Sequence, residues 1–86
     1  MVIYRRDTIE FSYSCRSDGW HMIHEIDDDD MGYWSAAEWI IPKESLAKLF
    51  SIISEEDFLE LCRKDSYTGM LDFLDSHNIK YIRKVS

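Results

Sequence analysis

The sequence predicts an α+β domain, in which a small antiparallel N-terminal sheet is followed by three short helices and a C-terminal strand. Residues 8–16 alternate apolar and polar side chains, which is typical of a strand with one buried face. From Pro42 onward, apolar residues recur at helical spacing instead. A chain of 86 residues with 45% hydrophobic content has room for one domain, residues 1–86, and not for two. Strands followed by helices favour helices packed on one face of the sheet.

The expected strands come first along the chain. Residues 8–16 form the most regular one, and residues 2–5 form a shorter strand before it. A Ser-Asp-Gly sequence at 17–19 indicates a turn. Residues 20–26 then follow either as the return strand of a hairpin or as two helical turns. Residues 33–41 leave the same two alternatives open.

Three helices are expected after Pro42, because proline suits the first turn of a helix. The first carries a stripe of apolar residues at i, i+3, i+4 and i+7, namely Leu46, Leu49, Phe50 and Ile53. The second, over 54–64, begins at Ser54, which can cap it, and continues with three acids that suit the positive end of the helix dipole. A break at 64–66 separates it from a third helix over 66–77. Residues 79–85 predict the final strand.

Charge is distributed unevenly over the chain, which has a net charge of −7. Residues 17–42 contain seven acids, no Lys or Arg, and all three tryptophans, whereas the acids and bases elsewhere balance. A directed negative field beside large amphipathic rings would steer and anchor a basic partner. The alternative is that the tryptophans belong to the core and the acids to a solvated loop.

The centre of this acidic stretch is IDDDDMGYWSAAEW, residues 26–39. Four adjacent aspartates repel one another, and a hairpin turn needs only one or two Asp or Asn, so the excess indicates a contact surface. We therefore predict a non-enzymatic inhibitor or immunity-type antagonist. It would bind a basic protein, such as a nuclease or another nucleic-acid-binding protein, by presenting carboxylates in place of phosphates. The predicted contact residues are Asp27, Asp28, Asp29, Asp30, Tyr33, Trp34 and Glu38, with Trp20 and Trp39 as further anchors.

A calcium-binding module is the second hypothesis. Positions 1, 3, 6 and 12 of the calcium-loop pattern fall on Asp27, Asp29, Gly32 and Glu38. At these positions the segment 27–38 resembles an EF-hand loop. The resemblance implies Asp27, Asp29 and Glu38 as ligands, between two helices. Position 5, however, is Met31, which offers no oxygen, so we expect no bound metal and no cofactor.

Other function classes fit the sequence less well. The histidines have no nucleophile elbow or glycine-rich loop beside them, so no enzyme is predicted. A helix-turn-helix over 54–77 is the third hypothesis. Residues 65–78 contain no Lys or Arg to meet phosphates, so direct nucleic-acid binding is disfavoured. There is no apolar run of membrane-spanning or signal-peptide type. The two cysteines, Cys15 and Cys62, are expected to be reduced core residues of a cytoplasmic protein.

Overall fold

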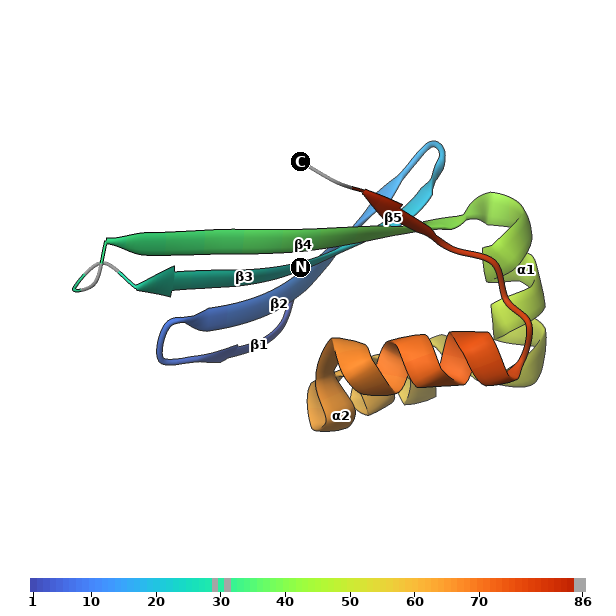
Figure 1. Ribbon diagram of the computed structural model, residues 1–86. Helices are drawn as coiled ribbons and strands as arrows, with labels where there is room; N and C mark the ends of the chain where they lie inside the picture. Colours follow the sequence, from blue (N-terminus) through green and yellow to red (C-terminus); the bar gives the residue numbers. More distant parts are fainter. Residues whose placement is uncertain (29, 31, 85–86) are drawn as a thin grey trace.

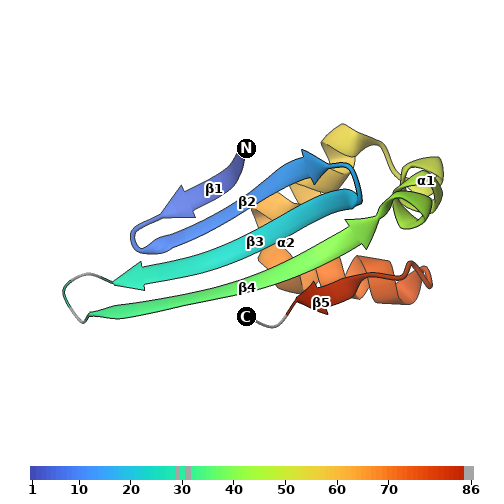
Figure 2. The same ribbon diagram turned by 90° about the horizontal axis from the view of Figure 1, so that it is seen from above.

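The computed structural model describes residues 1–28, 30 and 32–84, and their fold is α+β. The elements are β1 (Val2–Arg6), β2 (Ile9–Arg16), β3 (Gly19–Asp28), β4 (Tyr33–Pro42), α1 (Lys43–Ile52), α2 (Glu55–Ser76) and β5 (Ile82–Lys84). The strands form one sheet in the order β1-β2-β3-β4-β5, and every neighbouring pair is antiparallel. Both helices lie on one face of this sheet (Figure 1). We call the opposite face, which is nearer the viewer in Figure 2, the outer face.

The prediction of three helices is wrong. Residues 66–77 do not form a helix of their own, because residues 66–76 belong to the second half of α2, which runs from Glu55 to Ser76. The expected break is reduced to a kink at one residue, Ser66, with φ 61° and ψ −160°. Its hydroxyl lies 2.8 Å from the Tyr4 hydroxyl, so the kink is tied to β1. The Ser54 cap does form, accepting a hydrogen bond of 3.1 Å from the Asp57 amide.

The ambiguous segments at 20–26 and 33–41 are strands. They belong to β3 and β4, which pair along ten residues each, from Gly19 opposite Pro42 to Asp28 opposite Tyr33. At about 3.3 Å per residue each strand is about 33 Å long. Figure 1 shows both helices under one end of this hairpin, while the other ends of β3 and β4 extend beyond them. The β3–β4 hairpin is therefore an arm with a covered base and a projecting end.

The core lies between the helices and the sheet. Alternate side chains of the strands point into it and pack against the buried side chains of the two helices. Trp20 stacks on Tyr13 with the ring centroids 4.8 Å apart and meets Phe50 of α1 edge-on at 5.2 Å. Cys62 of α2 is buried, and burial raises the pKa of its thiol to about 12. Cys15, at the end of β2, is exposed, so its predicted place in the core is wrong. The largest fully buried side chains are Phe11, Phe58, Met22, Ile41, Leu49, Met70, Leu74 and Cys62.

Two further expectations concern the last strand and the membrane. The final strand covers only Ile82–Lys84 within the predicted range 79–85, and residue 85 lies outside the described residues. Among the described helices, none is long and apolar enough to cross a membrane.

Candidate functional site

Of the predicted contact residues, Asp27, Asp28, Asp30, Tyr33 and Trp34 lie at the projecting end of the β3–β4 hairpin, whereas Glu38 lies farther along β4, opposite Ile23. In the strand register Asp27 lies opposite Trp34, and Asp28 lies opposite Tyr33. Asp27 and Asp30 are exposed, and Trp34 is 62% exposed. The predicted residue Asp29 lies outside the described residues, as does Met31. The hairpin therefore brings carboxylates and an exposed indole together, as a surface for a basic partner requires.

Only one of the three tryptophans belongs to this surface. In β4, the side chains at 34, 36 and 38 point to the outer face and those at 35, 37 and 39 to the helices, because successive residues of a strand face opposite sides. Trp39 is therefore 2% exposed and stacks on Tyr67 of α2, with ring centroids 5.1 Å apart. Trp20 is 7% exposed. The prediction of Trp20 and Trp39 as further anchors is wrong, since both rings are part of the core.

A cavity of about 270 Å³ lies on the outer face beside Trp34. Its lining residues come from β3, β4 and β5, namely Ile23, Glu25, Trp34, Ala36, Glu38 and Lys84. The lining thus combines apolar side chains with two carboxylates. Within the described part of the chain, Glu25 forms no ion pair, whereas Glu38 lies 3.5 Å from the Lys84 ammonium. Glu25 is therefore the carboxylate of this cavity that no described base neutralises.

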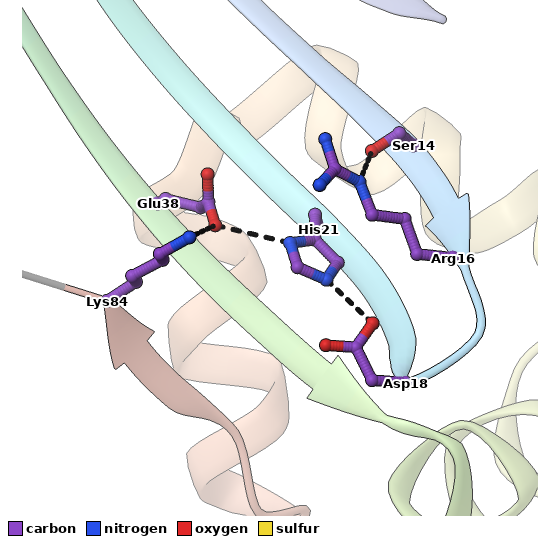
Figure 3. Close-up of polar contacts among 6 residues, drawn as sticks. All are labelled: Ser14, Arg16, Asp18, His21, Glu38 and Lys84. Atoms are coloured by element: carbon purple, nitrogen blue, oxygen red, sulfur yellow. Dashed lines mark hydrogen bonds and ion pairs between the residues drawn. The ribbon is translucent and has the colours of Figure 1, made fainter.

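Glu38 also belongs to a polar network on the outer face, shown in Figure 3. His21 Nε2 lies 2.8 Å from Asp18 Oδ1, and His21 Nδ1 lies 3.2 Å from Glu38 Oε2. The His21 ring is buried, with 4% of the residue exposed. A neutral imidazole donates from one nitrogen only, so both contacts are hydrogen bonds to carboxylates only when His21 is an imidazolium.

This network makes the contribution of Asp18 to stability depend on pH. The hydrogen bond from His21 holds the pKa of Asp18 below its ordinary value of 3.8. A carboxyl with a lowered folded pKa contributes stability that is fully present above its unfolded pKa and is lost as pH falls through its folded pKa. We expect Asp18→Asn to lower the free energy of unfolding above pH 3.8, and the difference from the unmodified chain to shrink below it. Urea unfolding at several pH values measures this difference, and a difference that grows on acidification would contradict the assignment.

The geometry of residues 27–38 differs from that of an EF-hand. The resemblance implies a helix on each side of the loop. Residues 27–28 are instead the end of strand β3, and residues 33–38 belong to strand β4. Asp27 lies opposite Trp34, and Glu38 lies opposite Ile23, so the first and last implied ligands are four ladder positions, about 13 Å, apart along the strands. No group of three potential metal ligands is found in the part of the chain that the structure describes. Calcium binding stays a prediction of the sequence.

A second cavity, of about 180 Å³, lies on the helix-facing side of the same hairpin. It is lined by His24, Ile26, Ser35, Ala37, Trp39, Tyr67 and Arg83. The His24 ring lies 4.7 Å from that of Tyr67, and burial lowers the pKa of His24, which favours the neutral ring. Arg83 lies over the Trp39 ring at 5.7 Å. None of the residues predicted to contact a partner on the hairpin end lines this aromatic cavity. The sequence does not reveal the cavity, because Tyr67 and Arg83 come from distant parts of the chain.

Fold and surface together define a small acidic α+β domain with a projecting, tryptophan-bearing hairpin. Comparisons with protein-family models, with curated proteins and with solved structures found no match.

Proposed function

We propose that this protein is a non-enzymatic antagonist that binds a basic protein partner through the end of its β3–β4 hairpin. The observation that carries the proposal is the exposed ring of Trp34, directly opposite Asp27 on a projecting hairpin. Tryptophan is among the residues that most often dominate binding energy at protein interfaces. Carboxylates beside it attract a basic surface over long distances and select against acidic ones.

The partner class follows from this chemistry. A nuclease or another nucleic-acid-binding protein carries a basic surface for phosphates, and Asp27, Asp28 and Asp30 offer negative charge in their place. Glu38 has a different role from the other predicted contact residues. Its carboxylate already faces His21 and Lys84, so it orders the outer face next to the contact surface.

The triple variant Asp27→Asn, Asp28→Asn and Asp30→Asn tests the proposal. Asparagine keeps the size of each side chain and removes its charge. We expect binding of the basic partner to become about 100-fold weaker, with most of its salt dependence lost. The measurement is affinity capture from the cells that produce the protein, at low and high salt, with the captured proteins identified by mass spectrometry.

Trp34→Ala is the matched second variant. It should weaken capture while leaving the salt dependence unchanged, because it removes an anchor and no charge. Glu44→Gln, on the exposed side of α1, is the charge control and should leave capture unaltered. Equal capture of the same basic proteins by the unmodified chain and the triple variant would refute the proposed function.

A further inference from the structure

A groove of about 820 Å³ lies between α1 and the start of β5. One wall is the first turn of α1, and the other is the segment 78–83, which leads from α2 into β5. Figure 1 shows this segment running beside α1. The Lys48 ammonium of α1 donates a hydrogen bond of 3.0 Å to the Asn78 carbonyl oxygen, so the two walls are held together.

Ser45 of α1 contributes a hydroxyl without a hydrogen-bond partner to this groove. The residue is only 6% exposed, and it lines the groove. Its hydroxyl forms no hydrogen bond with any residue that the structure describes. Every fully enclosed side-chain oxygen or nitrogen in the described chain does have a partner, so the Ser45 hydroxyl is open to the groove. Buried polar groups are normally hydrogen-bonded, and here a ligand can supply the missing partner.

The first turn of α1 adds backbone donors beside this hydroxyl. The first N–H groups of a helix have no partner within it, and those of α1 begin at Lys43, directly after Pro42. No side chain of the described residues caps this end of the helix by a hydrogen bond. Such N–H groups carry the positive end of the helix dipole and bind phosphate or other anions. The amides of 43–45 and the Ser45 hydroxyl thus offer donors for one oxyanion.

The facing wall supplies a positive charge and apolar surface. Lys80 lines the groove and is exposed, and it forms no ion pair within the described part of the chain. Ile79, the ring of Tyr81 and Ile82 line the groove beside it. Ile82 is 54% exposed, so this wall keeps apolar surface in contact with water. An organic group attached to the oxyanion would cover that surface.

Two carboxylates, those of Glu44 and Asp75, also line the groove. Their charges oppose a bound anion and lower its affinity. A phosphate group meets this opposition better than a carboxylate does, because it carries more charge and has three strong acceptor oxygens for the donors of α1.

We infer that the groove between α1 and β5 binds a small phosphomonoester with an apolar organic group. The phosphate accepts hydrogen bonds from the first amides of α1 and from the Ser45 hydroxyl, and Lys80 neutralises part of its charge. The organic group lies against Ile79 and Tyr81. This groove is at the covered base of the β3–β4 hairpin, whereas the proposed contact with a basic partner is at the projecting end. The inference is therefore independent of the proposed function.

Titration of the full chain with phenyl phosphate and with inorganic phosphate tests the inference. The measurement is the shift of backbone amides in nuclear magnetic resonance spectra at constant ionic strength. We expect saturable shifts of the amides of 43–45 with both probes. Phenyl phosphate should bind about tenfold more tightly than inorganic phosphate, because its ring buries apolar surface. Benzoate, which has the same ring on a carboxylate, should bind about tenfold more weakly than phenyl phosphate.

Ser45→Ala tests the role of the hydroxyl. We expect the affinity for phenyl phosphate to fall about tenfold, because one hydrogen bond to a charged group is lost. The thermal stability of the free protein should stay the same or rise. The hydroxyl has no partner to lose there, and alanine is the best helix former.

Two charge variants should change the affinity in opposite directions. Lys80→Gln should weaken binding of phenyl phosphate about threefold, and Asp75→Asn should strengthen it about threefold. Lys64→Gln, an exposed base of α2 outside the groove, is the matched charge control and should leave the affinity unaltered.

Several results would overturn the inference. The absence of saturable shifts at 43–45 with phenyl phosphate would reject the site. Equal affinities for phenyl phosphate and inorganic phosphate would reject the organic group, and an unchanged affinity in Ser45→Ala would reject the role of the hydroxyl. The triple Asn variant of the hairpin should bind phenyl phosphate as the unmodified chain does. Loss of partner capture in that variant with phenyl phosphate binding intact would support both proposals separately.

Discussion

Replacing Trp39 by alanine is expected to lower the free energy of unfolding by about 3–5 kcal/mol. The ring is 2% exposed and joins three elements. It stacks on Tyr67 of α2, lies under Arg83 of β5, and its residue pairs with Met22 of β3. Truncation would leave a cavity in contact with each of these elements. The free energy of unfolding of a native protein is only about 5–15 kcal/mol in total, so this substitution removes a large share of the stability.

Trp34→Ala is the matched control for this prediction, since it removes the same side chain five residues away in the same strand. Trp34 is 62% exposed, and surface substitutions of this kind usually change stability by less than about 0.5 kcal/mol. Equilibrium urea unfolding followed by circular dichroism compares the two variants. A Trp34→Ala variant as unstable as Trp39→Ala would contradict the placement of the two rings on opposite faces of β4.

Gly19→Ala is expected to destabilise the protein by about 3 kcal/mol or more. Gly19 begins β3 with φ +141°, a conformation that favours glycine. A Cβ atom there would lie 2.1 Å from the Ile41 carbonyl oxygen and 2.9 Å from the Pro42 Cα. Both are main-chain atoms at the end of β4, where the chain enters α1, so relief requires the strands to separate. Thermal and urea unfolding measure the loss.

Gly32→Ala is the control for backbone conformation alone. Gly32 has φ +66° but no atom within 4 Å of the added Cβ position. Its cost should be about 1–2 kcal/mol, the penalty of a left-handed conformation for a residue with a Cβ. If Gly19→Ala costs no more than Gly32→Ala, the close approach of β3 and β4 at Gly19 is wrong.

Local sequence patterns predict the α+β fold class. The errors in the predicted helices come from contacts between residues that are distant in sequence. Residues 8–16 predict β2 because their alternation matches one buried face of a strand. Lys64-Asp65-Ser66 has the composition of a break, and in the structure this break is confined to one non-helical residue, Ser66, inside α2. Tyr4, from the other end of the chain, meets Ser66 there. The periodicity of residues 54–77 contains no information on that contact.

The candidate site likewise has a part that the sequence predicts and a part that depends on contacts distant in sequence. Asp27, Asp28, Asp30 and Trp34 are close in sequence, so the charge pattern places them on one surface before the structure is considered. Glu38 looks equally available from its neighbours, which include no Lys or Arg. The fold, however, brings Lys84 of β5 and the buried His21 to its carboxylate. Counting charges along the chain therefore overestimates the negative potential at Glu38. The count misses basic side chains that come close to Glu38 only when the strands pair.

The strand order has a consequence for the sequence of folding events. β1, β2, β3 and β4 pair with one another in chain order, so each hairpin among them can close over a short loop, which favours rapid formation. β5 is different, because α1 and α2 separate it from β4, and it adds three residue pairs. The meander can thus be complete before its last strand docks. Whenever β5 detaches, Glu38, Trp39 and Ile40 of β4 lose the strand that pairs with them on their outward side.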